Sequence, residues 1–180
     1  MKHPFRWVAI GAGVVIALFA AILAANVTTD PRTELNTSPL LGKPAPAFTL
    51  TQFDGTKLRA TDLVGKTVIV NFWNSWCDPC LAELPALQRW YADHQSDPGV
   101  VMVGIPRDDS SSAIRAAARK DHMGWAVAND RGAEDANLAY GTRGQPESFV
   151  INPSGRIVGS VIGPVNAATL DKMLRVGQGV

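Results

Sequence analysis

The chain has 180 residues, enough for one domain with a hydrophobic core. Its 17 basic and 16 acidic residues nearly balance, so the composition gives no electrostatic footprint for nucleic acid. Hydrophobic residues make up 46% of the chain, which is apolar for a soluble protein, and the excess lies at the N-terminus.

The N-terminal segment has the pattern of a signal anchor. An uncharged apolar run, residues 7–25, follows the basic residues Lys2 and Arg6. As a helix it would span about 28 Å, close to the thickness of a hydrocarbon core. Basic residues favour the cytoplasmic side of a membrane, so we expect the rest of the chain on the outer, periplasmic face. The run is longer than most signal-peptide h-regions and lacks a good A-x-A cleavage site. The pattern therefore favours a membrane anchor over residues 1–25 rather than a cleaved signal peptide.

Residues 26–46 are polar and rich in proline, which predicts a flexible tether. The domain is then expected to span residues 47–180 and to open with a β-hairpin. Phe48 and Leu50 alternate with polar residues, and an Asp-Gly pair at 54–55 marks the turn between the two strands.

Strands and helices alternate along the rest of the chain. The apolar run TVIVNF, residues 67–72, suits a central strand buried on both faces. The other expected elements are a helix over 78–94, a strand over 100–105, helices over 110–122 and 133–141, a strand–turn–strand over 147–163, and a helix over 166–174. This order predicts an α/β sandwich with a mixed central sheet.

Cys77 and Cys80 are the only cysteines, and they lie at the junction between the first long strand and its helix. The first N–H groups of a helix lack partners and its dipole is positive there, so a thiolate at Cys77 is stabilised. The thiolate is the form that attacks a disulfide. Cys80, one turn further along, could attack a mixed disulfide formed at Cys77. Pro79 suits an early helical position, where its missing N–H does no harm.

Other roles for two cysteines fit less well. A zinc site needs four ligands, but the three histidines are scattered without metal-ligand spacing. Covalent haem attachment needs C-x-x-C-H, and residue 81 is leucine. A structural disulfide would close too small a loop to constrain much of the chain. We therefore expect a redox protein with no resident metal and no cofactor.

The segment VIVNFWNSWCDPCLAELP resembles the active-site segment of membrane-anchored, thioredoxin-like thiol-disulfide oxidoreductases of the TlpA, ResA and CcmG type. GKPAPAFTL and GQPESFVINPSGRIVG match further segments of this group, and the resemblance covers about residues 42–175 together with the anchor. It implies a thioredoxin-like fold with an N-terminal β-hairpin extension and an inserted helical segment. It also implies that Cys77 is the exposed nucleophile, that Cys80 is the resolving thiol, and that the pair forms a redox-active disulfide.

The resemblance implies a substrate-binding surface around the cysteines. Pro146 matches the cis-proline that faces the cysteine pair in this family and helps to bind the substrate backbone. Gln145 departs from the family, which usually has a small or apolar residue before that proline. Trp76 is the expected aromatic contact. The expected substrate-contacting residues are Trp76, Asp78, Pro79, Gln145 and Pro146.

Three residues in or near the motif bear on its thiol and proton chemistry. Glu83 lies three residues after Cys80, so the two share a helix face. It matches a glutamate that ResA and CcmG proteins carry near their cysteines, and the resemblance gives it a part in proton handling. Asn71 stands in the strand before the motif, where thioredoxin itself has a buried aspartate. Asp78 lies between the cysteines, where its negative charge opposes a thiolate at Cys77 and favours a reductant over an oxidant.

These features predict a membrane-anchored reductant of protein disulfides on the periplasmic face. The resemblance implies a disulfide-bearing client, apocytochrome c in cytochrome c maturation, and re-reduction by a membrane electron donor of the CcdA or DsbD type.

Two other functions stay open. GKPAPAFTLTQFDG also resembles the start of peroxiredoxins, although the peroxidatic frame P-x-x-x-T/S-x-x-C is absent. A copper chaperone of the Sco type uses two cysteines and a distal histidine. Here the cysteine spacing is shorter than in that group, and His122 lies in a polar helix end.

Overall fold

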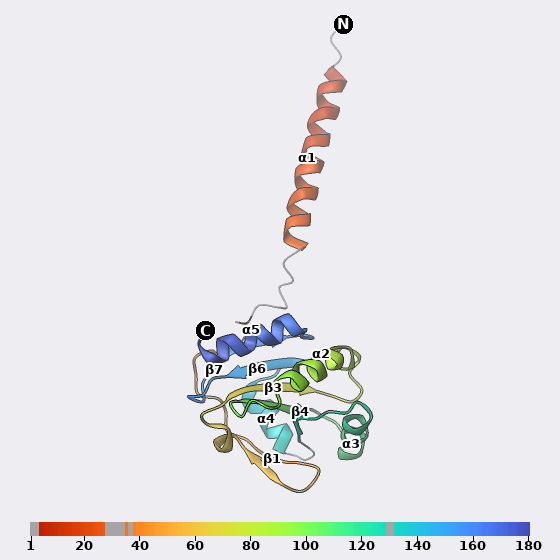
Figure 1. The fold of residues 1–180 in the computed structure, drawn as a ribbon. Helices are drawn as coiled ribbons and strands as arrows, with labels where there is room; N and C mark the ends of the chain where they lie inside the picture. The colour runs from red at the N-terminus through yellow and green to blue at the C-terminus, as the bar shows by residue number, and fades with distance from the viewer. Residues whose placement is uncertain (1–3, 28–34, 36–37, 129–131) are drawn as a thin grey trace. The chain divides into compact units, whose positions relative to one another are not determined.

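A computed structural model describes residues 4–27, 35, 38–128 and 132–180. The chain divides into two compact units, Met1–Pro31 and Arg32–Val180. The first unit contains helix α1 (Pro4–Val27), drawn in red in Figure 1. In the part of the chain that is described, no helix combines the length and the apolar character that a membrane span requires.

The sequence predicted that the domain begins at residue 47, but the second unit begins earlier, at Arg32. Leu35 is buried, and its carbonyl oxygen accepts a hydrogen bond from Ser160 N at 2.9 Å. The carbonyl oxygen of Lys43 accepts a hydrogen bond from Ile157 N at 3.0 Å. Part of the tether predicted over 26–46 is therefore fixed to the domain, because its backbone groups pair with the outer strand of the sheet. Residues 28–34 and 36–37 of that tether lie outside the described residues.

The predicted hairpin is present as β1 (Thr49–Thr51) and β2 (Lys57–Arg59), which pair antiparallel. At its turn, Asp54 Oδ1 accepts a hydrogen bond from Thr56 N at 2.9 Å, and Gly55 has a φ of 85°, which suits glycine. A short 3-10 helix, η2 (Ala60–Leu63), leads from the hairpin into the sheet.

The central sheet is mixed, as predicted, and has five strands in the order β5-β4-β3-β6-β7. β3 (Thr67–Trp73) is central, and all its residues are buried, which confirms the expectation from its apolar run. It pairs in parallel with β4 (Val100–Pro106) and antiparallel with β6 (Glu147–Ile151). The edges are β5 (Ala126–Val127) and β7 (Ile157–Ile162).

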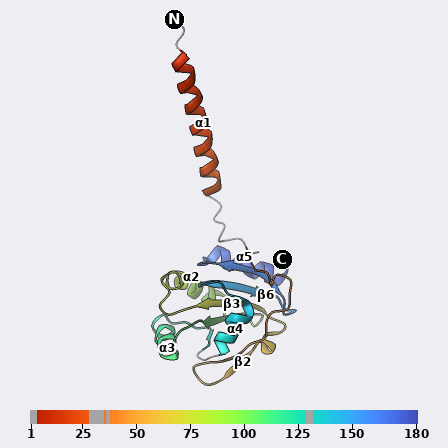
Figure 2. The ribbon, with the colours of Figure 1, turned by 180° about the vertical axis from the view of Figure 1, so that it is seen from behind.

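Two layers cover the sheet (Figures 1 and 2). Helices α2 (Asp78–His94) and α5 (Ala167–Gln178) pack on one face, together with α3 (Ser111–Lys120). Helix α4 (Gly132–Tyr140) and the hairpin pack on the other face. Three aromatic rings with centroids 5.1 to 5.7 Å apart fill that second layer: Phe72, Tyr140 and Phe149. The elements α3, β5 and α4 lie between β4 and β6 in the chain.

Candidate active site

The two cysteines lie where β3 ends and α2 begins. Cys77 is the N-cap of α2, and its Sγ accepts a hydrogen bond from Cys80 N at 3.2 Å. The two residues form a disulfide with a Cα–Cα distance of 5.2 Å. Pro79 lies in the first turn of α2, where its missing N–H leaves no hydrogen bond unmade, as the sequence predicted.

Cys77 is less exposed than the resemblance implied. Its exposed fraction is 5%, against 1% for Cys80, so both are buried although Cys77 is the more accessible. The loop before β6 contributes to this burial, because Gln145 O lies 3.8 Å from Cys77 Sγ. A partner sulfur therefore has to approach Cys77 past this loop and the exposed first turn of α2.

The loop before β6 contains the proline that the sequence singled out. The Gln145–Pro146 peptide is cis, as predicted for Pro146. Pro146 is buried and Gln145 is half-buried, and the carbonyl oxygen of Pro146 accepts a hydrogen bond from Gly163 N at 2.8 Å. That bond joins the loop to the end of β7. The loop therefore presents backbone oxygen, rather than a mobile side chain, to Cys77.

The other three predicted contact residues form the exposed rim of the site. Trp76 is 60% exposed, and Asp78 and Pro79 are also exposed. They precede or begin α2 beside the disulfide, so the structure brings all five predicted contact residues to one end of the sheet. Trp73, in contrast, is buried at the end of β3 and packs in the same core as both cysteines.

Glu83 is buried, with an exposed fraction of 2%, although it carries a carboxyl group. Its Oε1 accepts a hydrogen bond from Asn71 Nδ2 at 2.9 Å, and its Oε2 accepts one from Val165 N at 2.8 Å. Burial raises the pKa of the Glu83 carboxyl to about 7, while the two hydrogen bonds act in the opposite direction. Glu83 can therefore gain or lose a proton near neutral pH.

Asn71 connects Glu83 to the sheet. Its Nδ2 also donates to Ser148 Oγ at 3.1 Å, which links β3 to β6. Asn71 and Ser148 are both buried. Ser148 and Val165 were not predicted, because neither lies near the cysteine motif in the chain.

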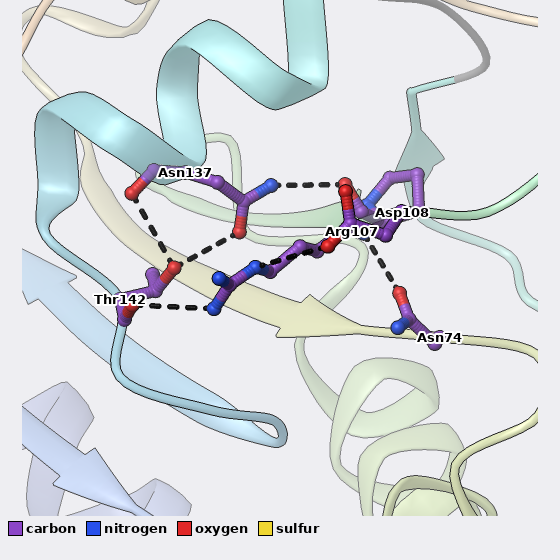
Figure 3. Close-up of polar contacts among 6 residues, drawn as sticks. Asn74, Arg107, Asp108, Asn137 and Thr142 are labelled. Carbon is purple, nitrogen blue, oxygen red and sulfur yellow. Dashed lines mark hydrogen bonds and ion pairs between the residues drawn. The ribbon is translucent and has the colours of Figure 1, made fainter.

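A second polar network supports the other side of the site (Figure 3). Arg107 N, just after β4, donates to Asn74 Oδ1 at 2.8 Å, and its guanidinium donates to Thr142 O at 3.3 Å. Thr142 Oγ1 in turn donates to Asn137 Oδ1 at 3.1 Å. These bonds connect the segment before Cys77 with the loop before β6. These bonds were not predictable from local residue patterns, because they join three separate elements.

A second buried acid holds the loop before β6. Glu147 is 1% exposed, and its Oε2 accepts a hydrogen bond from Arg143 N at 3.0 Å. Burial raises the pKa of the Glu147 carboxyl, although the Arg143 N–H and the charges of Arg143 and Arg107 oppose this. Among the described residues, no group of three or more histidine, cysteine, aspartate or glutamate side chains is arranged to hold a metal ion.

The fold and the site together define a thiol-disulfide oxidoreductase with a thioredoxin-like fold: a C-x-x-C disulfide at a helix N-terminus faces a proline loop. The AhpC/TSA family matches residues 41–160, and the chain belongs to this family.

Individual relatives agree with this assignment. The chain is 32% identical over 164 residues to the thiol-disulfide oxidoreductase ResA of Oceanobacillus iheyensis, which covers 89% of this chain and 82% of that protein. It is 31% identical over 129 residues to ResA of Bacillus subtilis, which covers 72% of this chain and 71% of that protein.

Solved structures show the same fold. A thiol:disulfide interchange protein of the thioredoxin family from Chlorobium tepidum superposes with a TM-score of 0.67 at 28% identity, covering 74% of this chain and 94% of that chain. StoA from Bacillus subtilis superposes with a TM-score of 0.61 at 26% identity, covering 72% and 96%.

Proposed function

We propose that the chain is an extracytoplasmic reductant of protein disulfides. The observation that carries this proposal is the position of Cys77. Its Sγ lies at the N-terminus of α2, 3.2 Å from Cys80 N and 3.8 Å from Gln145 O. The N-terminal end of a helix favours a thiolate, and a carbonyl oxygen beside the sulfur offers a hydrogen-bond acceptor to a bound peptide.

The reaction transfers two electrons from the reduced cysteine pair to a client disulfide. The Cys77 thiolate attacks one client sulfur, a Cys77–client disulfide forms, and the client S–S bond breaks to leave one client thiolate. The Cys80 thiol then loses its proton and attacks Cys77 Sγ. This second step forms the Cys77–Cys80 disulfide and releases the other client thiolate. Protonation of both client thiolates completes the reduction.

Glu83 serves the second step as the acceptor of the Cys80 proton. It lies one helical turn after Cys80, and burial raises the pKa of its carboxyl to about 7. A carboxyl with this pKa takes up a proton near neutral pH far more readily than an exposed glutamate, whose pKa is about 4.3. The buried position also keeps the proton close to the cysteine pair.

The position of Asp78 supports the reducing direction of electron transfer. Its carboxylate stands between the cysteines in the first turn of α2 and disfavours a thiolate at Cys77. A less stable reduced form gives up its electrons more readily, which suits a reductant.

The client and the electron donor are assigned by resemblance to the TlpA, ResA and CcmG group. We infer that apocytochrome c is the client and that a membrane protein of the CcdA or DsbD type returns electrons to the pair. The location outside the cytoplasm, and anchoring by residues 1–25, rest on the sequence alone. Alkaline phosphatase fused after residue 180 tests the location, because that enzyme is active only outside the cytoplasm.

A trapping experiment tests the function. The full-length Cys80→Ser variant, expressed in a bacterium that makes c-type cytochromes, is expected to accumulate mixed disulfides through Cys77. Mass spectrometry identifies the captured proteins. The matched control is Cys77→Ser, which keeps one cysteine at the inner position and is expected to capture none. Capture of other exported proteins without apocytochrome c overturns the client assignment. If no capture occurs and the wild type fails to reduce peptide disulfides, the proposed function is wrong.

A further inference from the structure

The hydrogen bonds around Glu83 fit only one of its protonation states. Asn71 Nδ2 donates to Oε1 at 2.9 Å, and Val165 N donates to Oε2 at 2.8 Å. Both carboxyl oxygens therefore face donors, which suits the ionised carboxylate. A protonated carboxyl carries an O–H donor on one of its two oxygens, so that oxygen would face another donor.

Protonation can be accommodated on only one of the two oxygens. The backbone N–H of Val165 cannot become an acceptor, so Oε2 has to keep its lone pair for that bond. The proton therefore belongs on Oε1, which faces Asn71. A side-chain amide carries a donor and an acceptor on the same carbon. Rotation by half a turn about the Cβ–Cγ bond of Asn71 would replace Nδ2 with Oδ1 opposite Glu83.

The second partner of Asn71 tolerates the same rotation. Ser148 Oγ now accepts from Asn71 Nδ2 at 3.1 Å. A hydroxyl can also donate, because its hydrogen rotates about the C–O bond. After the rotation, Asn71 Oδ1 would accept from both Glu83 Oε1–H and Ser148 Oγ–H, so no hydrogen bond among these groups would be lost.

We propose that Asn71 is a positioning residue that, together with Ser148, keeps the Glu83 carboxyl in one place in both of its protonation states by reversing its side-chain amide. The proposal rests on the proposed function, in which Glu83 receives the Cys80 proton. In that step one proton passes from Cys80 Sγ to Glu83 Oε1, and no bond between heavier atoms changes in the Asn71–Ser148 pair.

The burial of the pair makes this reversal necessary. Asn71 and Glu83 are each 2% exposed, and Ser148 is fully buried, so these groups are shielded from bulk solvent. An unmade hydrogen bond at such depth costs the full desolvation of the group. Burial raises the pKa of Glu83 to about 7, and no charged side chain contributes to this shift among the described residues. On α2 itself, the titratable group one turn before Glu83 is Cys80. The groups that the neighbouring elements place around Glu83 and Asn71 are uncharged: Asn71 from β3, Ser148 from β6, and the Val165 N–H from the segment before α5.

Nuclear magnetic resonance of the full-length, oxidised protein tests the reversal directly. In the ionised state, the Asn71 Hδ2 atoms lie near Ser148, and a cross-relaxation peak to the Ser148 Hβ atoms is expected. Acidification should remove this peak with the same midpoint as the 13Cδ titration of Glu83. A peak that persists below the Glu83 midpoint overturns the proposal.

Glu83→Gln provides a fixed mimic of the protonated state. In this variant the side-chain oxygen at position 83 can accept from Val165 N only if the side-chain nitrogen faces Asn71, which then has to present Oδ1. The Asn71–Ser148 peak should therefore be absent at every pH. Its presence in this variant contradicts the reversal.

Substitution of Asn71 gives a second readout. Asn71→Asp places a second carboxyl beside Glu83 and is expected to raise the midpoint of the Glu83 titration by about one pH unit or more, because like charges disfavour each other. Ser148→Ala is the matched control. Ser148 serves both amide orientations equally, so its loss should lower the melting temperature and leave the Glu83 midpoint unchanged. A Glu83 midpoint that moves in Ser148→Ala but not in Asn71→Asp overturns the proposal.

The outcomes separate this inference from the proposed function. If Cys80→Ser traps no client while the amide still reverses, the function is wrong and the positioning role stands. If client reduction is normal while the amide never reverses, only the positioning role is wrong. Should Asn71→Asp fail to fold, the wild-type titration and Glu83→Gln still decide the question.

Discussion

At the scale of single residues, the two cysteines differ because the helix treats them differently. Cys77 caps α2 and receives the Cys80 N–H at 3.2 Å, whereas Cys80 lies inside the first turn, 1% exposed. A free N–H aimed at a sulfur stabilises its anion, and the positive end of the helix dipole adds to this. The same backbone group therefore favours ionisation of Cys77 and offers nothing to Cys80.

We expect Cys77 to react faster than Cys80 with iodoacetamide in the reduced protein. The pH dependence of alkylation, followed by mass spectrometry, should give a pKa for Cys77 below that of a free cysteine, which is about 8.5. Cys77→Ser and Cys80→Ser each leave one thiol and provide the matched pair. Equal rates for the two single-cysteine proteins would show that the helix start does not set the roles.

Glu83 offers a second comparison at this scale. Glu83→Ala removes both acceptors and leaves Asn71 Nδ2 and Val165 N without partners. Each unsatisfied buried group costs about 1–3 kcal/mol. We therefore expect urea unfolding at pH 8 to show a loss of about 2–5 kcal/mol for Glu83→Ala. Glu83→Gln, which retains an acceptor, should show no such loss. Equal losses in the two variants would mean that neither hydrogen bond decides the stability at this position.

At the scale of elements, residue patterns predicted most of the architecture. The apolar run of β3 and the helical spacing after Asp78 indicated both elements of the active-site junction. Both α3 and α5 begin at a side-chain cap, since Ser110 Oγ accepts from Ala113 N and Asn166 Oδ1 accepts from Thr169 N. β5 was missed because only two residues pair with β4, too few for a periodic pattern. α5 continues to Gln178, past the predicted end at residue 174.

The extra turn of α5 explains a glycine inside a helix. A Cβ atom at Gly177 would overlap Thr67 Cγ2 and lie 2.8 Å from Val150 Cγ2. The absence of a side chain thus lets α5 lie against β3 and β6. This close approach holds α5 against the sheet. Val165, whose N–H donates to Glu83, lies just before the start of α5.

Gly177→Ala is therefore expected to destabilise the protein, although alanine is the better helix former. The gain in helix propensity is about 1 kcal/mol. Overpacking against the sheet costs about 1–3 kcal/mol and displaces the helix. Urea unfolding measures the net loss. Gly144→Ala is the control, because a Cβ atom there meets nothing within 4 Å. A Gly177→Ala protein as stable as the wild type would show that α5 can shift freely.

At the scale of the whole molecule, the site is assembled from distant parts of the chain. Asn71 contacts Glu83 across 12 residues, Ser148 across 77, and Glu83 contacts Val165 across 82. The helix spacing predicted that Glu83 shares a face with Cys80. It could not predict burial or the partners of Glu83, because these depend on how α2, β6 and the segment before α5 meet around β3. The resemblance supplied Pro146 for the same site, whereas Arg107 and Thr142 had no signal in the sequence.

Buried acids also give the whole molecule a distinctive dependence of stability on pH. Burial raises the pKa of Glu83 from 4.5 to about 7, and burial also raises the pKa of Glu147. The folded protein therefore binds more protons than the unfolded chain above pH 4.5. The stabilisation that the protonated Glu83 carboxyl contributes is fully present below about pH 4.5 and is lost as pH rises through about 7. For Glu83 alone the loss is on the order of 3 kcal/mol.

We expect this loss in the free energy of unfolding of the oxidised protein, measured in urea at pH 5 and at pH 8. The Glu83→Gln variant, measured under the same conditions, is the reference. Oxidation keeps the thiols out of the titration, and the Gln variant removes the Glu83 contribution alone. The variant should be close to the wild type at pH 5 and more stable than it at pH 8. Asp54→Asn is a control that does not titrate in this window, because hydrogen bonds from Thr56 lower the pKa of Asp54 below 3.8. Its contribution to stability is lost only as pH falls below that value, so its difference from the wild type should be the same at pH 5 and at pH 8. If the difference between the wild type and Glu83→Gln is the same at both pH values, the Glu83 carboxyl does not titrate in this range, and its assignment as proton acceptor for Cys80 fails.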